Sequence, residues 1–200
     1  MNIKILKMQD HCPDGYKDVN CTSRSKDWGY GLSPFFLGPI PLYGGRTSLN
    51  MENAWQYAKL YKNYADENDN PTAEYWKWAE RGWANGIAQR YPMGKGSKPL
   101  CSLWDGKKLG YNEARRAIYA PLYAAAVAKT DAFSLLKKAC ESGSVAIRDF
   151  DGYDHDALGM SLDQVMVCES RKMGHVFVLK MLLLGRTDLL TVPETVEGVK

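Results

Sequence analysis

Four polar residues recur at helical spacing in one segment of the chain: Glu52, Gln56, Lys59 and Asn63. On a helix with about 100° per residue, they fall within about 60° of one another. The rest of that helix is mostly apolar or aromatic, which is typical of a buried helix. A buried carboxylate, amide and ammonium must satisfy one another or a ligand, so the stripe is a candidate wall of a polar site. In the alternative interpretation, the stripe is the solvated side of a surface helix.

A second group of reactive side chains lies in one short acidic loop. Asp149, Asp151, Asp154 and Asp156 occur with His155 within eight residues, at the end of an expected strand. Like charges this close repel unless solvent, a cation or a partner separates them. Three interpretations stay open: a solvated turn, Mg²⁺ bound by one or two carboxylates, or general acid/base chemistry. The spacing and the distal Glu of an EF-hand are missing.

Several familiar kinds of site are not indicated. The five cysteines include no C-x-x-C pair, so free thiols in a reducing compartment are expected and a zinc site is not. No G-x-S-x-G motif occurs. His175 lies among apolar residues, which is more typical of a core histidine than of a catalyst. The basic stretch 94–98 lacks P-loop spacing and is either a solvated loop or a mobile phosphate contact.

The elements that would position these residues follow from periodicity and from breaking residues. We expect a strand at 1–8, an extended hairpin at 32–47 turning at Gly44-Gly45, and a strand at 144–150. Helices are expected at 50–64 with Asn50 as N-cap, at 72–90, 112–129, 131–141 and 162–184. Pro121 should kink or split the third helix, and 91–111 is expected to be loop.

Composition sets the class of protein. The 200 residues carry a net charge of +3 and 45% hydrophobic residues, as in one ordinary globular domain, and do not demand nucleic acid. The N-terminus does not have the pattern of a signal peptide, and the longest apolar segment is too short to span a bilayer. We expect a cytoplasmic protein without a membrane partner, and the sequence does not indicate its oligomeric state.

Two segments near the start of the chain follow a recognisable order: Leu32-Ser-Pro-Phe-Phe and then Met51-Glu-Asn-Ala-Trp-Gln-Tyr-Ala-Lys-Leu. They resemble the opening segment and the "S-E-H-Y-F-Q-A-x-K-F" helix of the NADAR (YbiA-like) family. Segments 114–126, 133–143 and 173–182 resemble later helices of the family. Departures include Asn53-Ala54 in place of the family's His-Tyr, and no "W-G" after the acidic strand.

The resemblance implies a compact, mainly helical domain with minor β-structure over residues 32–185, between an N-terminal extension (1–31) and a C-terminal tail (186–200). Members are N-glycosidases that act on ADP-ribosylated guanine in nucleic acid or on ribosyl intermediates of the riboflavin pathway. For this chain we expect no cofactor and assign no metal ligand. The expected partner is therefore ADP-ribosylated nucleic acid or a nucleotide-like small molecule.

N-glycosidic cleavage builds positive charge on the sugar, which carboxylates near the anomeric carbon stabilise. The expected catalytic residues are Glu52, Asp149 and Lys59, the last as a phosphate-binding ammonium or a Schiff-base nucleophile. The expected substrate-binding residues are Trp55, Gln56, Trp104, Lys95, Lys98 and Asp151. Two alternatives stay open: a module that binds ADP-ribose or a nucleotide without cleavage, and a phage-type inhibitory protein.

Overall fold

The computed structural model describes residues 1–191. Helices hold 39% and strands 16% of the structure, and three of the strands form a parallel sheet, so the fold is mixed α/β. The prediction of a mainly helical domain is therefore wrong. The physical reason is that segments without a strong periodic pattern gain their strand structure by pairing with distant segments.

The parallel sheet is built around one buried strand. β8 (Ser144–Asp149) lies between β1 (Ile3–Lys7) and β2 (Tyr16–Asn20), parallel to both. The apolar run of residues 145–147 is fully buried, as is typical of a central strand in a parallel sheet. The strands expected at 1–8 and 144–150 are confirmed, whereas β2 was not predicted. Residues 1–31, expected as an extension, thus supply both neighbours of β8.

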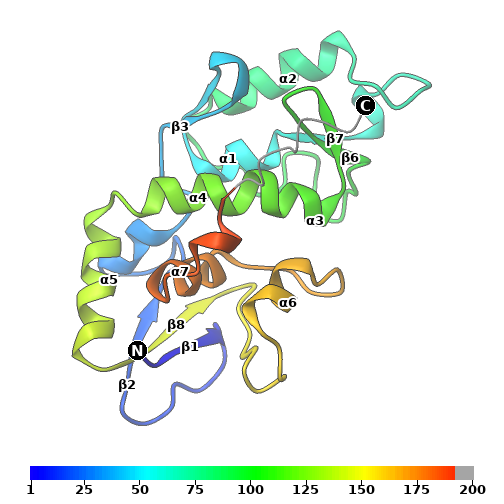
Figure 1. The fold of residues 1–200 in the computed structure, drawn as a ribbon. Helices are drawn as coiled ribbons and strands as arrows, with labels where there is room; N and C mark the ends of the chain where they lie inside the picture. The colour runs from blue at the N-terminus through cyan, green and yellow to red at the C-terminus, as the bar shows by residue number, and fades with distance from the viewer. Residues whose placement is uncertain (192–200) are drawn as a thin grey trace.

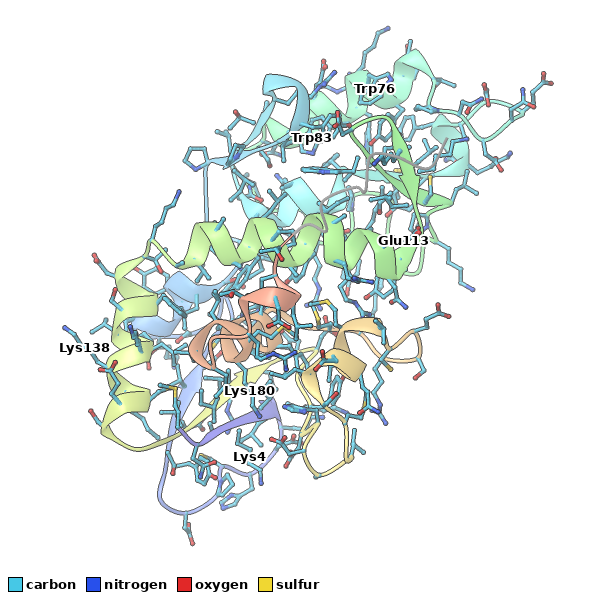
Figure 2. All side chains as sticks on the ribbon, viewed as in Figure 1. Lys4, Trp76, Trp83, Glu113, Lys138 and Lys180 are labelled. Atoms are coloured by element: carbon cyan, nitrogen blue, oxygen red, sulfur yellow. The ribbon has the colours of Figure 1, made fainter. Side chains whose placement is uncertain are left out.

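One long helical run separates the molecule into two groups of elements (Figure 1). It comprises α3 (Tyr111–Ala114), a π-helical segment (Arg115–Tyr119) and α4 (Ala120–Val127). On one side lie the parallel sheet, α5 (Asp131–Ser142), α6 (Leu162–Val167) and α7 (His175–Leu183). On the other side lie α1 (Met51–Gln56), α2 (Ala73–Trp83) and the antiparallel strands. Figure 2 shows Trp76 and Trp83 on the α2 side of this run and Lys180 on the sheet side.

The antiparallel strands form two small sheets. β3 (Ile40–Pro41) pairs with β4 (Thr47–Ser48), which confirms the hairpin that turns at Gly44-Gly45. β6 (Cys101–Trp104) pairs with β5 (Lys59–Leu60) and with β7 (Lys107–Leu109). The expectation of loop throughout 91–111 is therefore wrong. Short 3₁₀ turns lie at Trp28–Leu32, Tyr43–Gly45, Lys62–Tyr64 and Thr187–Leu189.

Three predicted helices are shorter than expected or divided. α1 ends at Gln56, because the backbone oxygens of Ala58 and Leu60 accept hydrogen bonds from Leu103 and Leu100 at the β5–β6 pairing. The helix expected at 72–90 ends at Trp83. The helix expected at 162–184 is two helices, α6 and α7. The helix expected at 131–141 is confirmed as α5.

The predicted interruption at Pro121 is confirmed as a change of helix type. Pro121 has no N–H to donate to the preceding turn, and the π-helical segment ends at Tyr119, two residues before it. Such wide turns are common at functional sites. Of the predicted C-terminal tail, residues 192–200 lie outside the described residues.

Candidate functional site

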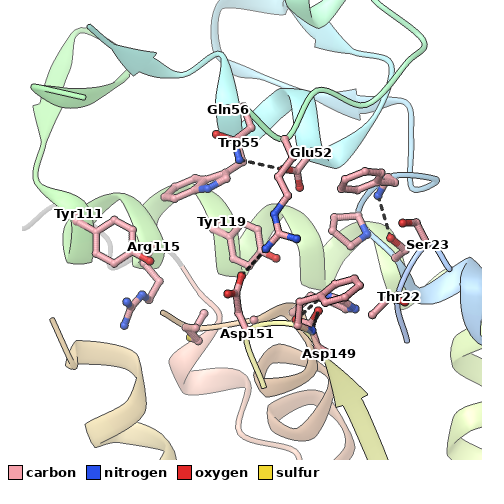
Figure 3. A pocket seen from close by; sticks show the side chains of 18 residues that line it. Thr22, Ser23, Glu52, Trp55, Gln56, Tyr111, Arg115, Tyr119, Asp149 and Asp151 are labelled. Carbon is pink, nitrogen blue, oxygen red and sulfur yellow. Dashed lines mark hydrogen bonds and ion pairs between the residues drawn. The ribbon is translucent and has the colours of Figure 1, made fainter. Parts of the chain in front are cut away.

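A pocket that is open on one side lies between the carboxyl edge of the parallel sheet and α1. Its cavity volume is about 120 Å³. Because β1, β2 and β8 are parallel, their carboxyl ends meet at one edge, which is where ligands bind in open α/β sheets. Figure 3 shows Glu52, Trp55 and Gln56 of α1 on one side of the pocket, with Asp149 and Asp151 opposite them. The other labelled lining residues are Thr22, Ser23, Tyr111, Arg115 and Tyr119.

The α1 wall is a hydrogen-bonded chain of three side chains. Gln56 Nε2 donates to Glu52 Oε1 at 2.9 Å, and Lys59 Nζ donates to Gln56 Oε1 at 2.7 Å. Glu52 is 6% and Gln56 is 8% exposed, so the buried interpretation of the stripe holds for both. Burial raises the pKa of Glu52, opposed by the hydrogen bond from Gln56 and the charge of Lys59. A carboxyl with a raised pKa can hold a proton for donation.

Lys59 stands behind this wall and is not among the residues that line the pocket. It lies on β5 and places its ammonium 4.8 Å from the ring centre of Trp55. Burial lowers its pKa to about 8, although the charge of Glu52 opposes this shift. Its contacts with Gln56 and Trp55 show that it supports two residues that do line the pocket.

Asp149 and His175 form a buried pair on the opposite wall. His175 Nε2 lies 2.8 Å from the backbone oxygen of Cys21 and must donate to it, because a carbonyl only accepts. His175 Nδ1 lies 3.2 Å from Asp149 Oδ2, a contact that needs a second proton between the two atoms. Asp149 Oδ1 accepts from the backbone N–H of Phe150 at 2.7 Å. The geometry therefore favours an imidazolium beside an ionised carboxylate.

The electrostatics of this pair agree with that assignment. Burial disfavours both charged forms, but each charge stabilises the other. The pKa of His175 is raised because the charge and hydrogen bond of Asp149 outweigh burial. The pKa of Asp149 is lowered because the charge and hydrogen bond of His175 outweigh burial. One pocket thus holds a carboxyl that burial shifts towards the protonated form, Glu52, and one that its partner keeps ionised, Asp149.

Arg90 joins the pocket from the segment that follows α2. Its Nη2 donates to Asp151 Oδ2 at 2.9 Å. Asn53, fully buried on α1, holds this segment by donating to the backbone oxygens of residues 82, 85 and 87 and by accepting from the N–H of residue 89. Asn53 is one of the departures from the NADAR pattern, and here it positions the segment that carries Arg90.

Arg115 and Tyr119 come from the π-helical segment. Arg115 Nη1 donates to the backbone oxygens of Val165, Met166 and Cys168 at 3.0–3.2 Å, and Nη2 donates to that of Arg171. These bonds take up the carbonyls at the end of α6 and explain why α6 does not continue into α7. Burial raises the pKa of Tyr119, as do the nearby charges of Glu52, Asp149 and Asp151.

Several predicted site residues lie elsewhere. Trp104 packs edge-on against Tyr43, with ring centres 4.9 Å apart, and does not line the pocket. Lys95 and Lys98 are exposed on the loop before β6 and do not line it either.

The acidic loop is divided between the pocket and contacts with β1 and α7. Asp149 and Asp151 line the pocket, while Asp154 pairs with Lys4 at 3.2 Å and Asp156 pairs with Lys180 at 2.7 Å. Lys180 also lies 2.9 Å from His155 Nε2, so these residues anchor the loop to α7. Among residues 1–191, no group of three or more His, Cys, Asp or Glu side chains is arranged to hold a metal ion.

Several residues of the pocket carry no signal in the sequence. Thr22 and Ser23 follow β2 and could have been found only by predicting a parallel sheet. Arg90, Arg115 and Tyr119 carry no motif, and His175 was interpreted as a core residue. The remaining unpredicted lining residues are Ser33, Pro34, Phe35, Tyr111, Phe150, Met173 and Gly174.

Comparison with known proteins gives one family. Within residues 1–191, every helix is too short or too polar to cross a bilayer. No curated protein and no solved structure matches the chain. A family model, described as a family of unknown function (DUF6939), matches residues 2–159. That match includes all three strands of the parallel sheet, α1 and most of the pocket. The chain belongs to this DUF6939 family.

Proposed function

We propose that this protein is an N-glycosidase that hydrolyses the bond between a ribosyl group and a nucleobase. The observation that supports the proposal is that two carboxyl groups lining one pocket have pKa values shifted in opposite directions. Burial raises the pKa of Glu52, whereas its partner His175 outweighs burial and lowers that of Asp149. Two carboxyl groups whose surroundings shift their pKa values in opposite directions are typical of glycoside hydrolysis. The resemblance to the NADAR family is part of the same proposal.

The proposed reaction balances with water as the only co-reactant. The C–N bond breaks, its electron pair leaves with the base nitrogen, and Glu52 gives that nitrogen a proton. Ionised Asp149 stabilises the positive charge on the sugar and takes a proton from the water that attacks the anomeric carbon. Transfer of a proton back to Glu52 restores the resting site, and the products are a free base and a free sugar.

The remaining pocket residues have supporting roles in this proposal. Trp55, half-buried on the wall, supplies an aromatic face for a base. Gln56 and Lys59 hold the Glu52 carboxyl through their hydrogen-bonded chain. Lys59 is thus assigned a positioning role, in place of the phosphate contact or nucleophile that the sequence indicated. Asp151 holds Arg90 at the pocket.

The proposed setting is a reducing compartment such as the cytoplasm. The support for it is that all five cysteines are free thiols, three of them half-buried and two buried.

The test compares turnover by the wild type, Glu52→Gln and Asp149→Asn on ADP-ribosylated guanine oligonucleotides and on ribosyl pyrimidines. Release of the free sugar or base is measured by mass spectrometry, and binding of ADP-ribose is measured separately by calorimetry. Each substitution should lower turnover by about 10²–10⁴-fold, as expected for loss of a proton-transfer or charge-stabilising group. Glu141→Gln, exposed on α5, is the matched control and should retain wild-type turnover.

Two outcomes would contradict the proposal. Binding of ADP-ribose without release from any substrate would identify a binding module. Neither binding nor release would favour the inhibitory-protein alternative.

A further inference from the structure

An exposed aromatic ring at the mouth of the pocket holds two guanidinium groups. Phe150 follows Asp149 directly, lines the pocket and is 39% exposed. Arg24 Cζ lies 5.2 Å from its ring centre, and Arg90 Cζ lies 5.7 Å from it. The two arginines come from segments more than 60 positions apart in the sequence. Cation–π contact with one ring therefore gathers two positive charges that would otherwise repel each other.

These charges are only partly neutralised. Among residues 1–191, Arg24 has no carboxylate within ion-pair distance, and Arg90 has only Asp151, through a single Nη2 contact. Lys172, exposed at the same rim, lies 4.0 Å from the other oxygen of Asp151. Arg90 and Lys172 therefore share the Asp151 carboxylate, and Arg24 adds a third cation at the Phe150 ring. Both guanidinium groups keep N–H donors for an incoming anion.

The arrangement is held in place by buried groups. Asn53 fixes the backbone from residue 82 to residue 89, directly before Arg90, through four hydrogen bonds. The Phe150 N–H is tied to Asp149 Oδ1 at 2.7 Å. Phe150, at the mouth of the pocket, is therefore bound directly to Asp149, whose carboxylate lines the pocket.

The volume of the pocket limits how much of a ligand it can hold, so the rest of the ligand must lie at the mouth. A cavity of about 150 Å³ accommodates one benzene ring, so this cavity of about 120 Å³ has room for a single small ring. If that ring is the sugar, its substituents must lie over the rim. A phosphoryl group offers three oxygens to two guanidinium forks, a better match than a second carboxylate beside Asp151.

We propose that Arg24 and Arg90, gathered on the ring of Phe150, form a binding site for a phosphoryl group carried by the ribosyl substrate. This site replaces the phosphate contact that the sequence suggested at Lys95 and Lys98. The proposal rests on the proposed function for the identity of the sugar. It concerns binding only, so it can fail or hold independently of hydrolysis.

The experiment measures binding without turnover. Ribose 5-phosphate, ribose and a short single-stranded oligonucleotide are titrated by calorimetry into the wild type and into Arg24→Gln, Arg90→Gln and Phe150→Leu. Loss of one charge-assisted contact should weaken binding of the phosphate about tenfold to hundredfold, and ribose should bind no more weakly to the variants than to the wild type. Arg24→Gln is the cleanest variant, since Arg24 is exposed and carries no ion pair among residues 1–191. Arg81→Gln, exposed on α2, is the matched control and should leave binding unchanged.

The outcomes separate the sources of the phosphate and the two proposals. Tighter binding of ribose 5-phosphate than of ribose, lost in Arg24→Gln, supports a small phosphorylated substrate. Arg24-dependent binding of the oligonucleotide alone supports a phosphate of nucleic acid. Equal binding of ribose and ribose 5-phosphate, with no Arg24-dependent oligonucleotide binding, overturns the phosphoryl site even if the protein hydrolyses ribosides. Phosphate binding without hydrolysis would leave this site standing and contradict only the proposed function.

Discussion

Gly174 allows the Asp149 carboxylate to approach His175, and a methyl group there should displace it. A Cβ built at Gly174 would overlap Asp149 Oδ2 and lie 3.3 Å from the backbone of Asp151. The φ of Gly174 is −73°, which any residue adopts, so Gly174→Ala introduces a side-chain clash and no backbone strain.

The cost follows from the contacts that are lost. Overpacking a buried site costs about 1–3 kcal/mol, and moving Asp149 also weakens its contact with His175, so we expect about 3 kcal/mol of lost stability. For a chain of this size each kcal/mol lowers Tm by about 2–4 °C, which gives a decrease of about 6–12 °C. Urea denaturation and calorimetry measure both quantities.

A double-mutant cycle tests the cause of this loss. In an Asp149→Ala background the added methyl group has room, so Gly174→Ala should cost less than about 0.5 kcal/mol there. Gly143→Ala is the control, because a Cβ at Gly143 meets nothing within 4 Å. An equal cost of Gly174→Ala in both backgrounds, or no cost in the wild type, would refute the reasoning.

Three further predictions concern the same site. Glu52→Gln should be more stable than the wild type at pH 8, and this difference in stability should disappear towards pH 4.5. Burial raises the pKa of Glu52 in the folded protein above its ordinary value of 4.5. The stability of the wild type therefore falls as pH rises from 4.5 through the folded pKa. Urea denaturation across pH 4–8 measures the margin, and a wild type more stable than the variant at pH 8 would contradict the assignment. The loss of stability in His175→Asn should be largest near pH 6. The pKa of His175 in the folded protein is raised above its ordinary value of 6.5. The wild type therefore has the full stabilisation from the charged imidazole below pH 6.5 and loses it as pH rises through the folded pKa. In urea denaturation at a series of pH values, the difference in stability between the two proteins should shrink as pH rises above 6.5. A difference that does not change with pH would argue against an imidazolium. Asn53→Ala removes four hydrogen bonds, which should lower the free energy of unfolding by about 2–4 kcal/mol. It should also accelerate amide hydrogen exchange at residues 85–90. Unchanged exchange at these residues would show that Asn53 does not hold the segment.

The sequence predicts the site best where local chemistry decides the structure. The Asn50 cap is confirmed, since its side chain accepts from the N–H of Asn53 at 2.8 Å. The spacing of Glu52 and Gln56 on one helical turn was enough to predict their contact. β6 and β7 could also have been predicted, because Asp105-Gly106 with positive φ at both residues is a typical two-residue hairpin turn.

Long-range contacts decide the remainder, and no local pattern shows them. β2 exists because its backbone pairs with β8, more than 120 residues later in the chain. α1 stops at Gln56 because β6 uses the backbone oxygens that follow it, and α6 stops because Arg115 binds its terminal carbonyls. Each of these contacts places a residue in the pocket or excludes one from it. The helical pattern alone therefore predicted too much helix and too few site residues.

The most direct test of the proposed hydrolysis follows the oxygen atom of water. Wild-type protein is incubated with a ribosylated nucleobase in H₂¹⁸O, and the products are analysed by mass spectrometry. We predict one ¹⁸O in the released sugar and none in the base. Glu52→Gln and Asp149→Asn should form neither product above about a hundredth of the wild-type rate. Intact substrate after prolonged incubation of the wild type, with the ligand bound in the pocket, would contradict it.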